Sequence, residues 1–218
     1  MINRVSQAAV VGRAHIRTLG GASARVLREA LLMHPSVARL AGILPQHPGA
    51  GDPIDWEEAA QRWGTPFPAD YRDFVSVYGG GSINCSLSIG LPLEVARGSR
   101  GPLLFEELIE CGYELLDLDP ADGPALEGKI SWAVDCSASQ AFWDTTDPDP
   151  DRWTTLVLTR DGDWVEYDCG MVDFLVGFLT GEISPQPMGM FSPDQPVFLN
   201  WQEERRLEEE GIDPWPHL

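Results

Sequence analysis

Two short apolar runs on either side of an Asp-Gly pair constrain the fold of this chain more than any other feature. Residues 153–159 and 164–167 are rich in β-branched and aromatic side chains, and Asp161 and Gly162 lie between them. An Asp-Gly pair readily adopts the backbone angles of the tight turns that join antiparallel strands. The pattern therefore predicts a β-hairpin, and with it an antiparallel sheet.

Two helices with clear end signals precede this hairpin. Asp55 is a good N-cap for the first helix, which carries Trp56 and Trp63 on one face and ends at Gly64. Pro68 lies where the first turn of the second helix is expected, a position that suits proline. A run of three glycines then ends the second helix.

The remaining apolar patterns complete the expected fold. Helical spacing and strand-like alternation predict helices at residues 103–118, 171–180 and 201–210, and strands at residues 82–91 and 130–143. Helices followed by antiparallel strands and a closing helix predict an α+β fold. We expect a single domain in which helices pack on an antiparallel sheet.

Charge and composition divide the chain into three parts. Residues 1–39 hold six arginines against one glutamate, a net charge of +5, whereas the remainder carries −24. Residues 1–32 are expected to be a basic N-terminal extension, either a disordered tail or an upstream stretch that is not translated, with Met33 as the start. The domain is expected at residues 33–183, and residues 184–218 are expected to be a Pro-rich C-terminal tail with a short helix.

The composition disfavours several classes of function. A net charge of −19 disfavours binding to nucleic acid and to anionic membrane surfaces. No run approaches the roughly 18 uncharged apolar residues of a membrane span. The single lysine, Lys129, follows no phosphate-binding loop motif. The four histidines lie outside the expected core, so a Ser-His-Asp or Cys-His site would need a terminal segment to fold back: His15, His34, His47 and His217.

The cysteines do not indicate a metal or redox site. They are more than 20 residues apart, they form no Cys-x-x-Cys pair, and no Cys/His pair has the spacing of zinc ligands. We expect reduced thiols, packed like small apolar groups, in a cytoplasmic protein. The four are Cys85, Cys111, Cys136 and Cys169. No cofactor and no metal are expected.

A run of aspartates flanked by tryptophans is the main candidate for a binding surface. Aromatic side chains beside carboxylates suit an interface with a basic protein. The spacing partly matches a calcium loop, but Arg152 and Leu158 stand where such a loop needs glycine and glutamate. A solvated acidic turn, weak binding of a hard cation and a partner-facing patch are the alternatives. The predicted partner-binding residues are Asp144, Asp147, Asp149, Asp151, Trp143 and Trp153.

The opening of the domain resembles that of the SUKH superfamily, whose best-known branch is the cell-wall-assembly regulator family. The pattern there is a helix with Trp and Gly, a helix that begins Leu/Phe-Pro-x-x-Tyr, and a Gly-rich turn into the first strand; Phe67 fills the apolar position here. The matching structural residues are Trp56, Trp63, Gly64, Pro68, Tyr71, Gly79 and Gly80. Residues 161–164 are similar to the late hairpin of the family, and residues 171–175 to its closing helix. The similarity covers residues 36–182 and is weakest at residues 92–130.

The resemblance implies a SUKH-like α+β protein without catalytic residues. Many members are cytoplasmic immunity proteins that bind the toxin domains, often nucleases, of polymorphic toxin systems. We therefore expect stoichiometric binding and neutralisation of a basic toxin, because an acidic surface finds a cationic one quickly. Two alternatives stay open: a regulatory scaffold that recruits an endogenous partner, as the cell-wall branch suggests, and a metal-assisted hydrolase that uses carboxylates.

Overall fold

The computed structural model describes residues 33–95, 103–117, 126–189, 196–216 and 218. The chain divides into two units, Met1–Leu32 and Met33–Leu218, and the description below concerns the second. The disorder expected for the first unit lies outside the described residues.

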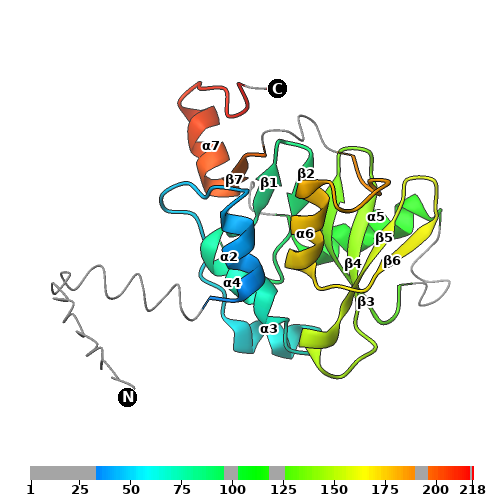
Figure 1. Ribbon diagram of the computed structural model, residues 1–218. Coiled ribbons are helices and arrows are strands. Elements are labelled where there is room, and N and C mark those ends of the chain that lie inside the picture. The colour runs from blue at the N-terminus through cyan, green and yellow to red at the C-terminus, as the bar shows by residue number, and fades with distance from the viewer. Residues whose placement is uncertain (1–32, 96–102, 118–125, 190–195, 217) are drawn as a thin grey trace, which may run out of the picture. The chain divides into compact units, whose positions relative to one another are not determined.

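Seven strands form one open sheet in which every neighbouring pair is antiparallel (Figure 1). The spatial order is β6-β5-β4-β3-β2-β1-β7, so the first six strands follow one another and β7 returns to pair with β1. β6 and β7 are therefore the edge strands. The bounds are β1 Gly81–Ile83, β2 Leu87–Ile89, β3 Lys129–Asp135, β4 Gln140–Asp144, β5 Thr154–Leu158, β6 Trp164–Tyr167 and β7 Phe198–Asn200.

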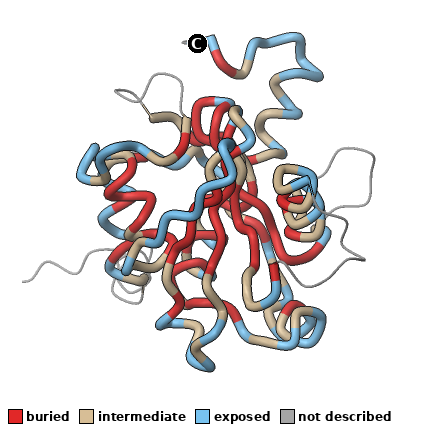
Figure 2. Tube along the Cα trace, turned by 90° about the vertical axis from the view of Figure 1, so that its right-hand side faces the viewer, coloured by how far each residue is buried: buried red, intermediate tan, exposed pale blue. Residues whose placement is uncertain are grey.

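Six α-helices accompany this sheet in the described part of the chain: α2 Pro35–Ala41, α3 Trp56–Trp63, α4 Ala69–Val77, α5 Phe105–Leu115, α6 Met171–Thr180 and α7 Trp201–Glu209. α2, α4 and α6 pack on one another, and α6 also contacts β5. α5 packs against β3. Phe142 and Trp143, adjacent in β4, point to opposite faces and join two different apolar clusters. The sheet thus has helices on both sides (Figure 2). The predicted α+β class with helices packed on an antiparallel sheet is confirmed.

Most expected helices and the hairpin are found where their end signals place them. Asp55 Oδ1 accepts hydrogen bonds from the N–H groups of Glu57 and Glu58, both at 3.0 Å, and so caps α3. Gly64 ends α3 in the left-handed conformation, with φ 72°. The hairpin of β5 and β6 turns at Gly162, where φ is 87°.

The strand expected at residues 82–91 is two strands. β1 and β2 are joined by a tight turn in which Asn84 and Cys85 have φ of 50° and 49°. Asparagine tolerates this left-handed region better than most residues. The alternation of apolar residues continues through the turn, which is why the sequence pattern alone predicted one strand.

The segment expected to be a C-terminal tail contributes to the core. β7 pairs with β1, and Phe198 is buried against the rings of Phe74 and Tyr78 at 5.9 and 5.3 Å. Met188 and Trp215 of the same segment are also buried. A three-residue strand within a proline-rich stretch is too short for alternation to reveal it. The helix expected at residues 201–210 is found as α7.

Candidate functional site

The four aspartates of the predicted acidic turn lie together between β4 and β5, and most of them hold the turn itself. Three of the carboxylates accept a hydrogen bond from the backbone N–H two residues further on: Asp144 from Thr146 at 3.0 Å, Asp147 from Asp149 at 2.9 Å, and Asp149 from Asp151 at 3.2 Å. Arg152 Nε lies 3.3 Å from Asp147 Oδ2. These bonds are typical of aspartates in turns, so much of this acidic cluster has a local structural role.

Asp151 caps a helix that is distant in the sequence. Its Oδ1 accepts a hydrogen bond of 2.6 Å from the N–H of Ala69, the first residue of α4. Pro68, at the N-cap of that helix, makes no side-chain capping bond. Asp151 therefore supplies the acceptor that serine or aspartate usually supplies at the N-cap.

Replacing Asp151 by alanine should lower the free energy of unfolding by about 1 kcal/mol, the usual cost of losing a cap. Asp151→Asn keeps a side-chain oxygen and should lose much less. Urea unfolding of both variants checks this. Equal losses for the two would mean that charge, and not the capping oxygen, stabilises α4.

The two tryptophans of the predicted interface are core residues, so that part of the prediction is wrong. Trp143 and Trp153 are 0% and 3% exposed. Trp143 packs edge-on against Tyr71 and Phe105, with ring centroids 4.9 and 5.7 Å away. Trp153 Nε1 donates a 2.8 Å hydrogen bond to the carbonyl of Asp147. The residue types alone did not indicate that Trp143, in β4, and Trp153, just before β5, point into the core.

The residues of the Trp-Gly-Pro-Tyr motif fix the packing of α3 and α4. Trp56 packs edge-on against Tyr71 at 5.8 Å. Tyr71 donates a 2.9 Å hydrogen bond to the carbonyl of Gly90, and Trp63 donates one of 3.0 Å to the carbonyl of Pro92. These contacts connect the two helices to the segment that follows β2.

The glycine turn at the end of the motif encloses a buried carboxylate. Asp52 is 5% exposed, and Gly80 N–H donates to it at 2.8 Å. Gly79 has φ 72°, and a Cβ there would lie 2.4 Å from Asp52 Oδ2 and 2.2 Å from Asn200 Nδ2. Only glycine fits at position 79, because the conformation and the close approach both exclude a side chain.

Asp52 also holds the C-terminal segment on the fold. Its carboxylate accepts hydrogen bonds from three side chains of β7 and α7: Asn200 Nδ2 at 3.2 Å, Trp201 Nε1 at 3.3 Å and Gln202 Nε2 at 3.0 Å. All of these donors are neutral. The arrangement stabilises a buried carboxylate by hydrogen bonds.

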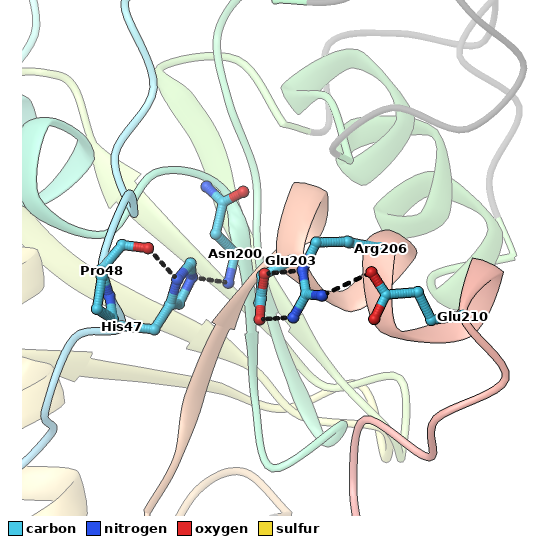
Figure 3. Close-up of polar contacts among 6 residues, drawn as sticks. All are labelled: His47, Pro48, Asn200, Glu203, Arg206 and Glu210. Carbon is cyan, nitrogen blue, oxygen red and sulfur yellow. Dashed lines mark hydrogen bonds and ion pairs between the residues drawn. The ribbon is translucent and has the colours of Figure 1, made fainter.

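Two histidines expected outside the core belong to the folded unit, and their ring nitrogens contact backbone groups. His47 Nε2 accepts a 3.3 Å hydrogen bond from the N–H of Asn200, and Nδ1 lies 3.2 Å from the carbonyl of Pro48 (Figure 3). His34 caps α2 through Nδ1. Both ring nitrogens of His47 thus contact backbone groups. Beside it, α7 carries the ion pairs Arg206–Glu203 at 2.7 Å and Arg206–Glu210 at 2.8 Å (Figure 3).

The expectation that the cysteines pack like small apolar groups holds only for Cys169, which packs against the main apolar cluster. Cys85, Cys111 and Cys136 are exposed and Cys169 is half-buried. Burial, with nearby aspartates, raises the pKa of the Cys169 thiol to about 11. Burial and neighbouring carboxylates also raise the pKa values of Cys85 and Cys111. These three thiols therefore stay protonated at neutral pH, which is opposite to the activation of a nucleophilic cysteine.

The β5–β6 hairpin exposes a surface that sequence reasoning missed. β6 is the last strand on its side of the described sheet, and Trp164 and Val165 are 39% and 36% exposed. Exposed carboxylates also lie on the strand and on the neighbouring loops. We call this the β6 edge surface, and it comprises Asp161, Asp163, Trp164, Val165, Glu166, Tyr167, Asp168 and Glu182.

A groove of about 840 Å³ lies beside β6 on the face that α6 covers. Val165 and Tyr167 of β6 line it, together with Ile183 and Met188 from the loop after α6. Tyr167 is held edge-on against Phe174 of α6, with centroids 5.1 Å apart. The charged lining residues are Asp161, Asp163, Glu182 and Arg160. The groove thus combines apolar area with an excess of negative charge.

Neither a metal centre nor a membrane span is found among the described residues. No three His, Cys, Asp or Glu side chains there lie close enough together to hold a metal ion. None of the helices in this part of the chain has the length and apolar character to cross a bilayer.

Comparison with known proteins found no relative of this chain. No protein-family model, no curated protein and no solved structure matches the chain.

Proposed function

We propose that this chain is a cytoplasmic immunity protein with a SUKH-like fold, and that it neutralises a basic toxin domain by stoichiometric binding. One observation carries the proposal. The β6 edge surface presents five exposed carboxylates together with an exposed tryptophan and valine, and Arg160 is the one cation among the described residues that line the adjoining groove. Apolar area beside an excess of charges of one sign is a composition suited to a partner of opposite charge.

The chemistry of the proposed target explains the sign of the charge. A nuclease has to present cations to phosphate, and its cationic surface attracts carboxylates over long distances. Binding to that surface blocks the toxin without any covalent step. In support, the order of α3, α4, the antiparallel strands and α6 agrees with the order that the resemblance implies.

Co-expression tests the proposal. The gene beside that of this chain is the first candidate source of a toxin domain, and the two should be expressed together in a sensitive host. We expect growth to be restored and a complex of defined stoichiometry to be purified. Continued toxicity with no complex would count against this pair, and a complex with an endogenous protein instead would favour the regulatory scaffold.

The carboxylates at the groove should control how fast the partner binds. Changing Asp161 and Asp163 to asparagine and Glu182 to glutamine should slow association about tenfold at low ionic strength, because steering by the surface is weakened. Stopped-flow association with the toxin domain measures this rate.

A matched control removes the same number of charges from the other face of the sheet. Glu107, Glu110 and Glu114 are exposed on α5. Their replacement by glutamine changes the net charge equally and should leave most of the rate intact. Equal slowing by both triple variants would show that only the total charge matters and that the β6 edge surface is not the site.

A further inference from the structure

We infer that the outer edge of β6 accepts an extended, cationic segment of the partner as an additional antiparallel or parallel strand, with alternate side chains in the groove. This inference rests on the proposed function, because it names the surface and the kind of segment through which a basic partner would bind. It is carried by three features of β6: free backbone groups, side chains that divide between two faces, and a preformed acidic groove.

The backbone of β6 has one row of hydrogen-bonding groups that points away from the sheet. Thr159 N–H donates to the carbonyl of Asp163 at 2.9 Å, which identifies these opposed residues as a hydrogen-bonded pair. The register continues with Val157 opposite Val165. Because such pairs alternate along an antiparallel ladder, the N–H and C=O groups of Trp164 and Glu166 face outward. A row of this kind, which pairs with no other strand of the described sheet, is a template for another strand.

Side chains on both faces of β6 lie beside that row and would contact an added strand. Val165 and Tyr167 lie on the α6 face and line the groove. Trp164 lies on the other face, where its ring centroid is 5.1 Å from that of Phe142 and 5.5 Å from Lys129 Nζ. Residues directly opposite one another on neighbouring strands are in contact distance, so alternate residues of an added strand would meet these two sets.

The loop after α6 forms the far side of the groove, and hydrogen bonds to the rest of the fold hold it in place. Ile183 N–H donates to the carbonyl of Gly177 at 3.0 Å, and Gln186 Nε2 donates to the carbonyl of Phe178 at 3.3 Å. Gly189 N–H donates to the buried carboxylate of Asp135. The loop is therefore anchored at three points, so a bound segment would not have to order it, which lowers the entropic cost of binding.

Charge selects a cationic segment over a second copy of this chain. Pairing of two β6 edges would bring the carboxylates of Asp163, Glu166 and Asp168 on one copy close to those on the other. Like charges opposite one another across strands are destabilising. A strand with lysine or arginine at alternate positions would replace each of these repulsive contacts with an attractive one. Acidic residues on an exposed edge are also a common protection against self-association.

A blocked octapeptide of alternating lysine and valine is the probe that tests this surface. At low ionic strength it should bind the full chain and slow hydrogen exchange at the amides of Trp164 and Glu166. The same peptide with N-methylated backbone positions along one edge should bind at least about tenfold more weakly, as expected when a strand loses its backbone bonds. An octapeptide of alternating glutamate and valine should not bind. Equal binding of the methylated peptide, or protection only outside β6, would overturn the inference.

Two substitutions at one position separate backbone pairing from charge. Glu166→Gln and Glu166→Pro both remove the carboxylate, but only proline also removes the outward N–H. Proline is tolerated at an edge position whose N–H faces solvent, and thermal unfolding checks that the variant folds. We expect Glu166→Pro to bind the probe at least about tenfold more weakly than Glu166→Gln, the effect of roughly one lost hydrogen bond. Equal affinities would contradict strand addition.

The same pair of variants distinguishes failure of this inference from failure of the proposed function. If Glu166→Pro still protects cells from the toxin and binds it as Glu166→Gln does, the partner binds elsewhere and only strand addition is lost. If the unmodified chain neither protects nor binds a basic toxin domain, the proposed function is lost, whatever the peptide does.

Discussion

Replacing Trp143 by alanine should lower the free energy of unfolding by about 4 kcal/mol, within the range for large aromatic side chains in cores. Trp143 is fully buried, and the rings of Tyr71, Phe105 and Trp132 pack against it at 4.9, 5.7 and 6.1 Å. Alanine would leave a cavity between α4, α5 and the sheet that this aromatic cluster cannot close. Urea unfolding at equilibrium measures the loss.

Trp143→Phe and Trp164→Ala are the matched controls. The indole N–H of Trp143 is buried without a hydrogen-bond partner among the described residues, so phenylalanine removes an unpaired donor and keeps much of the volume. It should cost about 1 to 2 kcal/mol. Trp164 is 39% exposed, and its replacement should cost less than about 1 kcal/mol of stability while weakening partner binding. A stable Trp143→Ala protein that fails to bind its partner would instead place Trp143 at the interface.

Replacing Asp52 by alanine should lower the free energy of unfolding by about 3 kcal/mol, because buried donors lose a charged acceptor. The N–H of Gly80 and the side chains of Asn200, Trp201 and Gln202 all donate to this carboxylate. Asp52→Asn keeps one acceptor oxygen and should lose about half as much.

The effect of Asp52→Ala should be concentrated in the C-terminal segment. β7 pairs only with β1 in the described sheet, so loss of the Asp52 contacts should free β7 and α7 before the rest unfolds. Hydrogen exchange should show faster exchange at residues 198–209 than in β3 to β5. Uniform exchange throughout the sheet would mean that Asp52 stabilises the whole fold and does not act as a local anchor.

The elements with strong local signals could be predicted from sequence alone. The Asp55 cap and the Gly64 stop fixed both ends of α3, and Asp161-Gly162 located the hairpin. α6 occupies the predicted residues because Gly181 adopts the left-handed conformation at its end. In each case the residues that determine the structure are neighbours in the chain.

The missed elements depend on partners that are distant in the sequence. β7 has three residues, and its pairing with β1 joins segments more than 100 residues apart. The Asp52 network joins the loop before α3 to α7 in the same way, and Asp151 caps a helix 82 residues earlier. No local sequence pattern predicts such contacts, because the neighbours of each participating residue carry no signal of its distant partner.

The predicted binding residues and the β6 edge surface share a chemical character but lie at different positions. Both combine acidic and aromatic residues, but Trp143 lies inward while Trp164 lies outward. Both are strand tryptophans next to an acidic residue. Their difference follows from the position of their strands: β4 is central in the sheet and β6 is at its edge. The order of strands in space decided which aromatic is accessible.

The ionic-strength dependence of association between this chain and the basic toxin domain that we propose as its partner tests the central claim most directly. If a carboxylate-rich surface recognises a cationic partner, the association rate constant should fall roughly tenfold or more between low and physiological ionic strength. A rate constant that stays level or rises across that range would contradict recognition by charge.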